Sequence, residues 1–169
     1  MNINTSRFGS ITVDEESILS FPEGIPGFEH TRRYAIVPHR TMQGHASPFR
    51  WLQSLDEPSL ALPVINPWSV RPDYAPTVAG LTIKQLGITD IREQAQFLTV
   101  VTIPVNNPAG ITVNLLAPIM VNRITHVAKQ VIVQNESYSI RTPILTLPVE
   151  APLPSVRCQR ELSAVGAAA

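Results

Sequence analysis

The sequence predicts a mostly all-β protein, a single compact antiparallel β-barrel-like domain with one or two short helices. Two observations support this. Proline accounts for 16 of the 169 residues, and because proline is excluded from helix interiors, few windows can hold a long helix. Short segments rich in β-branched and aromatic residues also recur between turn signals, which is typical of small barrels and sandwiches. The length is sufficient for one domain with a real core.

The N-terminal half is expected to contain a series of short strands. Residues 3–13 alternate loosely around Gly9 and predict two short strands or one bulged strand. The next predicted strands are 17–21, 34–37, 49–54 and 60–65. Pro63 lies inside the last one, which predicts an edge strand or a bulge because proline cannot donate to a ladder. Residues 21–29, 38–48 and 66–77 are expected to be loops.

The C-terminal half contains the strongest strand signal, residues 97–105, which is apolar on both faces and is therefore expected to be central and well covered. Short helices are expected at residues 82–86 and after Asp90, which has Glu93 at capping-box spacing. Further strands are predicted at 111–116, 119–121, 127–133 and 138–141. We expect residues 1–147 to form the domain and residues 148–169 to be a Pro/Ala-rich disordered tail.

Charge and cysteine content narrow the function classes. The formal net charge is zero, whereas a nucleic-acid-binding protein normally shows a basic excess. The single cysteine, Cys158, excludes an intrachain disulfide and fits a reducing compartment. No apolar signal-peptide core and no run approaching ~18 apolar residues is visible. We therefore expect a soluble cytoplasmic protein that has no direct contact with nucleic acid or membrane.

The sequence carries no catalytic or cofactor signature. It has no Gly-x-Ser-x-Gly elbow, no phosphate-binding loop and no dinucleotide fingerprint. Its four histidines are His30, His39, His45 and His126, and no carboxylate or cysteine lies at metal-ligand spacing from His39 and His45, which share a loop. We expect neither an enzyme nor a cofactor, a metal or a small-molecule substrate.

Four sequence blocks together point to one family. They are FPEGIPGFE at residues 21–29, PFRWLQS at 48–54, TVNLLAPIMVNR at 112–123 and KQVIV at 129–133. In this order and spacing they make the chain, across roughly residues 2–143, resemble the FliW family of flagellar assembly factors. Ala128 departs from the pattern, because a glycine often precedes Lys-Gln in the family.

The resemblance implies a small β-barrel-like protein without enzymatic activity that acts through protein partners. FliW proteins bind newly made flagellin near its C-terminal region, in a chaperone-like manner, and they also bind the translational regulator CsrA. Binding relieves CsrA repression of flagellin translation, at a site described as distant from the RNA surface. The family mechanism is partner switching, in which export of flagellin frees FliW to capture CsrA.

The blocks also supply candidate partner-binding residues. The 21–29 loop is proline-fixed and holds apolar and acidic groups, so it favours a contact surface, although an inward-folded Phe28 would make the loop only structural. Trp51 fits a core as well as a contact, and the two asparagines fit turn caps as well as contacts. The candidates are Glu23, Ile25, Phe28, Glu29, Phe49, Trp51, Gln53, Asn114, Asn122, Lys129 and Gln130.

Two alternative functions remain open at this stage. A small apolar ligand-binding β-barrel would need an internal cavity. A nucleic-acid-binding barrel would need aromatic residues interleaved with basic ones, and residues 97–105 contain no Lys or Arg. Charge is also uneven, with five acids in residues 14–29 and four arginines in residues 30–50. These groups either neutralise each other or form a polarised contact face.

Overall fold

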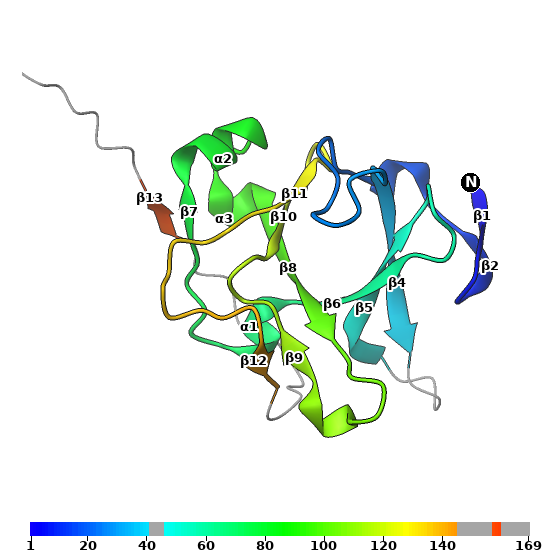
Figure 1. Cartoon of the computed structure of the whole chain (residues 1–169). Helices are drawn as coiled ribbons and strands as arrows, with labels where there is room; N and C mark the ends of the chain where they lie inside the picture. Colours follow the sequence, from blue (N-terminus) through cyan, green and yellow to red (C-terminus); the bar gives the residue numbers. More distant parts are fainter. Residues whose placement is uncertain (41–45, 145–156, 160–169) are drawn as a thin grey trace, which may run out of the picture.

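The computed structural model of the chain describes residues 1–40, 46–144 and 157–159 (Figure 1). Its main feature is a curved nine-stranded sheet that is antiparallel between all neighbouring strands. Along the main path, the strands are β11 (Ala128–Gln130), β10 (Ile119–Asn122), β8 (Ala95–Thr102), β6 (Ala61–Ile65), β5 (Ala46–Ser54), β4 (Arg33–Arg40) and β3 (Leu19–Ser20). Strand β9 (Thr112–Val113) pairs with the second half of β8, and β12 (Thr142–Pro143) pairs with β9. The mostly antiparallel β class is confirmed.

Smaller elements complete the fold. β1 (Asn2–Thr5) and β2 (Gly9–Thr12) form a separate hairpin, the two-strand form of the expectation for residues 3–13. The described residues contain three short α-helices, α1 (Pro67–Val70), α2 (Gly80–Gln85) and α3 (Ile91–Gln94), and two 3₁₀ turns, η1 (Glu15–Ser17) and η2 (Pro108–Gly110). The helix missed in residues 66–77 is α1. It starts where the Asn66 side chain accepts the Trp68 N–H, with Pro67 at its first position.

The sheet curls almost far enough to meet itself but does not close into a barrel. One isolated parallel bridge joins Ser20 to Val127, with the Ser20 N–H donating to the His126 carbonyl at 2.9 Å. In an extended strand the next N–H on the same side belongs to residue 22, which is proline and has none. The chain after β3 therefore does not continue a ladder along β11, and the fold is an open, barrel-like curl.

Strand β6 corrects the expectation drawn from Pro63. The strand is not an edge, because it pairs with β5 on one side and with β8 on the other. Pro63 is opposite Trp51, and the residue before it, Leu62, directs its backbone N–H and carbonyl towards β5. Its nitrogen therefore turns away from β5, towards β8, where the ladder begins only at Val64. The missing donor costs no ladder hydrogen bond.

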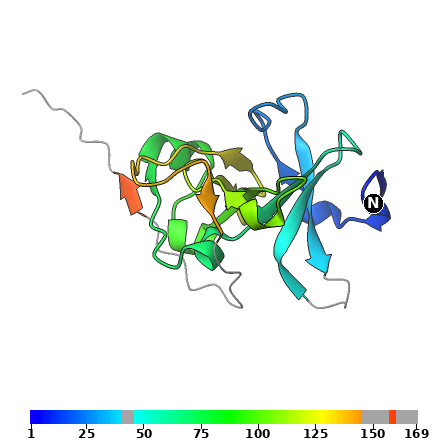
Figure 2. The same ribbon diagram turned by 60° about the horizontal axis from the view of Figure 1, so that its bottom comes forward.

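Two apolar cores lie on opposite faces of the curled sheet. The inner core fills the curl, and its largest side chains are Phe21, Tyr34, Leu52, Leu98 and Ile119. The outer core joins the far faces of β8 and β10 to the helices, β7 (Thr77–Ala79) and residues 131–138. Figure 2 shows these covering elements on one side of β8, away from β4 and β5. Because both faces of β8 are covered, the expectation for residues 97–105 is confirmed for the strand itself.

A further strand, β13 (Arg157–Gln159), pairs in parallel with β7. It falls within the segment that the sequence assigns to a disordered tail, where no strand signal is visible. The other residues of that segment lie outside the described residues, so the boundary at residue 147 stays a prediction. Among the residues that the structure describes, no helix is long and apolar enough to cross a membrane.

Candidate protein-binding site

The 21–29 loop is folded tightly on itself by its glycines. Gly24 and Gly27 have φ angles of +74° and +88°, in the left-handed region that favours glycine. A Cβ on Gly24 would lie 2.6 Å from the Cα of Glu29, so the loop ends approach too closely for any side chain. The Glu29 carboxylate accepts the Gly27 N–H at 2.9 Å, which lowers the pKa of Glu29. The loop is therefore a fixed turn.

The apolar residues of this loop divide between core and surface. Ile25 is only 3% exposed and belongs to the inner core, so it closes one end of the curl. Phe28 is half-buried and packs against the same core from its rim. The two interpretations of the loop thus apply to different residues, since Ile25 acts as a plug and Phe28 forms part of an accessible wall.

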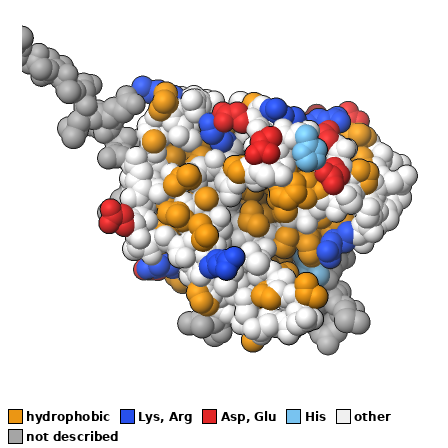
Figure 3. Space-filling view, viewed as in Figure 1, with side chains coloured by type: hydrophobic (Ala, Val, Ile, Leu, Met, Phe, Trp, Pro, Cys, Tyr) orange, Lys and Arg blue, Asp and Glu red, His pale blue; other side chains and the backbone are white. Residues whose placement is uncertain are grey.

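Around Phe28 the surface is concave, with a cavity of about 300 Å³ that we call the open mouth. Figure 3 shows apolar side chains gathered on this face, with charged ones around them. Its walls come from the loop, β6, β8, β11 and the segment before β12. The lining residues are Ile25, Pro26, Phe28, Leu62, Val100, Thr102, Asn114, Gln130, Ile140 and Arg141.

Two amide side chains of the open mouth are fixed by one backbone unit. The Ala117 N–H donates to Oδ1 of Asn114 at 2.8 Å, and the Ala117 carbonyl accepts from Nε2 of Gln130 at 2.9 Å. These partners define which amide atom is which. The Nδ2 of Asn114 and the Oε1 of Gln130 make no hydrogen bond with the described residues. A prepositioned donor and a prepositioned acceptor are thus available at the cavity wall.

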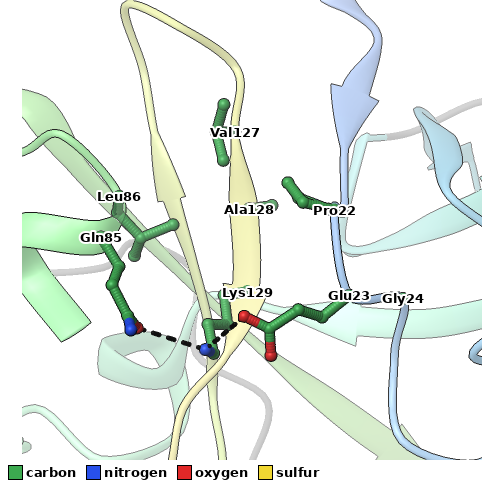
Figure 4. A pocket seen from close by; sticks show the side chains of 8 residues that line it. All are labelled: Pro22, Glu23, Gly24, Gln85, Leu86, Val127, Ala128 and Lys129. Carbon is green, nitrogen blue, oxygen red and sulfur yellow. Dashed lines mark hydrogen bonds and ion pairs between the residues drawn. The ribbon is translucent and has the colours of Figure 1, made fainter.

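Beside the loop, an unpaired seam separates residues 22–24 from β11 (Figure 4). The Nζ of Lys129 spans it, 2.7 Å from Oε1 of Glu23 and 3.3 Å from Oε1 of Gln85. Pro22 and Ala128 face each other across a small cavity of about 90 Å³. Glu23 and Lys129 therefore lie next to the open mouth and form an ion pair across the gap that the incomplete ladder leaves.

Phe49 and Trp51 lie away from this site. The Trp51 ring packs edge-on against Phe8, with its centroid 5.9 Å away, and the Arg7 guanidinium lies 4.2 Å above it. Its Nε1–H donates to Nδ1 of His39 at 3.4 Å. Trp51 thus seats the β1–β2 hairpin on the sheet. Phe49 packs against the outer core.

Gln53 and Asn122 are buried, at 0% and 1% exposure, so we leave them out of the candidate site. The Gln53 amide donates to the carbonyls of Ser54, Pro58 and Leu60. Its Oε1 is buried without a partner among the described residues, and nothing in the structure explains this. Asn122 donates to the Leu86 and Gly87 carbonyls and accepts the N–H groups of Ile124 and Thr125. Both therefore serve the fold.

The sequence interpretation missed several lining residues. Leu62 and Val100 occupy inward-facing positions, two residues along their strands from the buried Val64 and Leu98, and Thr102 lies two residues beyond Val100. Period-two alternation in residues 60–65 and 97–105 could have found them. Ile140 and Arg141 had no such signal.

The chain also matches a known family. The model of the family described as "FliW protein" matches residues 2–144. The chain belongs to the FliW family. It is 41% identical over 139 residues to the flagellar assembly factor FliW of Pseudothermotoga lettingae, covering 82% of this chain and 85% of that protein. It is 39% identical over 145 residues to the FliW of Leptospira interrogans, covering 86% and 93% of the two chains.

The fold comparison agrees. A crystal structure of the flagellar assembly factor FliW matches with a TM-score of 0.75 and 29% identity, covering 86% of this chain and 98% of that one. The open mouth and the seam lie wholly inside the FliW match, whereas β13 lies beyond it.

Proposed function

We propose that this FliW family member is a non-catalytic, cytoplasmic regulator of flagellum assembly that binds flagellin, at its C-terminal region, and the translational regulator CsrA. Capture of CsrA relieves its repression of flagellin translation, and flagellin competes for the same chain by partner switching. Any effect on RNA then passes through CsrA. Beyond the family match, the observation that supports this proposal is the open mouth, a fixed concave surface on a family whose name refers to flagellar assembly.

The open mouth has the physical character of a protein contact. Its lining is apolar at Phe28, Leu62 and Val100, and burying such a surface supplies most of the affinity in hot spots. The free amide groups of Asn114 and Gln130 suit a peptide backbone, which offers one acceptor and one donor per residue. Because the loop is already ordered by Gly24 and Gly27, docking there costs little conformational entropy.

The alternative of a small apolar ligand inside the barrel has less support. The inner core is filled by side chains such as Phe21, Tyr34 and Leu52, all fully buried. Three cavities lined by described residues open at the two ends and at the seam of the curl. Interiors packed in this way hold few voids larger than a water molecule. A packed interior favours the protein-binding function.

The test is a pair of matched aromatic truncations. Phe28→Ala removes the wall of the open mouth, whereas Phe8→Ala removes a half-buried phenyl ring on the opposite side of the sheet, beside Trp51. We expect Phe28→Ala to weaken binding to CsrA and to a flagellin C-terminal fragment by about tenfold or more, as hot-spot truncations do. Phe8→Ala should leave both affinities unchanged. Calorimetric titration with purified partners gives the dissociation constants.

A second variant separates binding from folding. Ile140 lines the open mouth and is 56% exposed, so Ile140→Asp should alter the surface with little effect on stability. We expect Ile140→Asp to weaken binding to both flagellin and CsrA while the melting temperature stays unchanged. The assignment of the open mouth is wrong if Phe28→Ala and Ile140→Asp both keep full affinity for flagellin and for CsrA.

A further inference from the structure

The opposite end of the curl forms a second cavity, of about 240 Å³, which we call the basic mouth. Its lining residues are Ser17, Leu19, Ile36, Arg50, Gln96, Val121, Arg123 and His126. The inward-facing residues of strand β8 show where the basic mouth lies. Gln96 lines the basic mouth, Leu98 is buried, and Val100 lines the open mouth. The two mouths are thus separated by the inner core.

Strand periodicity places positive charge at the basic mouth. On β5, Arg50 shares a face with Leu52, which is fully buried in the inner core, so the Arg50 side chain leaves the backbone on the inner face. Arg123 and His126 come from the turn between β10 and β11. His126 has a φ of +57°, and the Asn122 carbonyl accepts its N–H at 2.8 Å. A non-glycine residue in this region is uncommon and indicates that the surrounding turn fixes it.

The two guanidinium groups of the basic mouth, on Arg50 and Arg123, are not neutralised within the described chain. None of the lining residues is acidic, and the side chains of Arg50, Arg123 and His126 make no hydrogen bond or ion pair with the described residues. Three other cations of the described chain form ion pairs, Arg33 with Asp56, Arg71 with Asp73 and Lys129 with Glu23. The carboxylate of Glu15, two residues before Ser17, lies 3.5 Å from the N-terminal amine. The charge at the basic mouth therefore faces solvent.

The floor beneath these cations is apolar. Leu19 and Val121 are buried and belong to the inner core, and Ile36 packs against it. An apolar floor lowers the local dielectric and strengthens attraction between the cations and an anion above it. Guanidinium groups are suited to carboxylates because they present several N–H donors in a planar fork. A ligand that matches both features has a carboxylate at one end and an apolar body at the other.

We propose that the basic mouth binds a carboxylate carried on a short apolar body, supplied by a glutamate side chain next to an apolar residue of a partner protein. This site is separate from the open mouth, so it stands or falls independently of the contact proposed there. It gives the chain a second contact point at the other end of the curl.

The experiment is a titration of the ¹⁵N-labelled full chain at low, constant ionic strength. The probes are acetyl-Leu-Glu-Leu-amide, its glutamine counterpart, sodium butyrate and inorganic phosphate. We expect the glutamate peptide to shift the backbone amides of Leu19, Val121 and His126, and the glutamine peptide not to. Arg50→Gln and Arg123→Gln should each weaken the glutamate peptide by about tenfold, the usual scale for a lost charge-assisted hydrogen bond.

Controls and contrary outcomes follow from the same titration. Lys84→Gln makes the same charge change at an exposed position of α2 that lines neither mouth, and it should leave peptide binding unaltered. Because Arg123 is exposed in a turn, its variant keeps the test valid if Arg50→Gln fails to fold. Equal binding of the two peptides, or phosphate binding as tight as the glutamate peptide, would overturn the site. Binding of butyrate without the peptide would overturn the protein source and assign the site to free carboxylates.

Discussion

Pro22 and Gly24 shape the molecule at residue scale, although only two positions separate them. Pro22 has no N–H to offer β11, so the ladder that starts at Ser20 stops and leaves the seam open. Gly24 then turns the chain with a φ of +74°, and its Cα lies against the backbone of Glu29. Together they separate the loop from the sheet and present Phe28 at the open mouth.

A substitution pair tests the role of Gly24. Gly24→Ala combines a positive φ with a Cβ 2.6 Å from the Cα of Glu29, whereas Gly27→Ala has a φ of +88° and nothing within 4 Å. We expect Gly27→Ala to lower the free energy of unfolding by ~1 kcal/mol, from the dihedral alone, and Gly24→Ala to lower it by at least ~3 kcal/mol. Urea denaturation measures both. Equal losses would show that the close approach at Gly24 relaxes freely.

Residue chemistry explains what sequence could and could not say about the site. The glycines and prolines of residues 21–29 predict a rigid loop, because the backbone preferences of these residues are local. The burial of Gln53 and Asn122 is not local, since it depends on carbonyls at Leu60, Leu86 and Gly87 that meet them only in the fold. For Asn122 the turn-cap interpretation holds, because its side chain accepts the N–H groups of Ile124 and Thr125. Polar side chains are mostly exposed, so no local signal indicates that Gln53 is buried.

At element scale, the turn after β5 is attached to the start of β4 by one carboxylate. Asp56 accepts the backbone N–H groups of Arg32 and Arg33 at 2.7 and 2.9 Å, and Nη2 of Arg33 lies 2.8 Å from its other oxygen. Burial by itself raises the pKa of Asp56, but these N–H donors and the Arg33 charge outweigh it and hold the pKa below its ordinary value of 3.8. The acids at 56 and 57, rather than those of residues 14–29, are thus the partners of Arg33 and His30.

This lowered pKa predicts a pH-dependent contribution to stability. The folded carboxyl has a lower pKa than the unfolded one, so its stabilisation is fully present above pH 3.8 and disappears as pH falls through the folded pKa. Asp56→Asn should be less stable than the parent chain by ~1–2 kcal/mol at pH 7. The difference in the free energy of unfolding between the two chains should shrink below pH 3.8, as measured by urea denaturation between pH 7 and 2.

A matched control is available at Asp73. It pairs with Arg71 at 3.2 Å but is 77% exposed, against 22% for Asp56, so Asp73→Asn should change stability little at any pH. A gap for Asp56→Asn that stays constant down to pH 2 would contradict the role given to its charge.

The positions of the strands along the chain were easier to predict from the sequence than the way in which they pair in the sheet. Strands β4, β5, β6 and β8 overlap the predicted segments because β-branched residues and alternation are local signals. Their bounds differ: β4 and β5 extend into the loop predicted at 38–48, and β8 ends at Thr102, three residues before the predicted end at 105. Pro63 misled the prediction for β6, because an internal strand can hold proline where its nitrogen faces an unformed part of the next ladder. Helix α3 begins at Asp90 as expected, yet the side chain that reaches back is Gln94, which accepts the Thr89 and Asp90 N–H groups.

The whole molecule is organised around β8. Its inward residues complete the inner core and its outward residues, such as Phe97 and Val101, complete the outer core, so the curl and the helical layer are expected to unfold together. Strand patterns could not predict that the curl stays open. The outcome depends on one bridge at Ser20, which brings β3 to β11, and on Pro22, which stops the ladder there. The FliW match ends at residue 144, where the Ile144 N–H donates to the Ile111 carbonyl at 3.1 Å.

Within residues 148–169, the described contribution to the fold is the three-residue ladder of β13 on β7. We therefore expect a chain that ends at residue 147 to unfold cooperatively, with a melting temperature lowered by only ~2–4 °C, which corresponds to ~1 kcal/mol at this size. Circular dichroism melting measures it.

A single substitution distinguishes the ladder from the rest of the segment. Thr77 bonds Asn135 and Gln134 on one side of β7, so its neighbour Val78 faces β13 and pairs with the Gln159 N–H. Gln159→Pro in the full chain removes that N–H and should reproduce any loss seen on truncation if pairing with β7 is its source. A loss on truncation that Gln159→Pro does not reproduce would locate the contribution elsewhere in residues 148–169. A chain ending at residue 147 that has no cooperative transition would show that the segment belongs to the domain, and the boundary at 147 would be wrong.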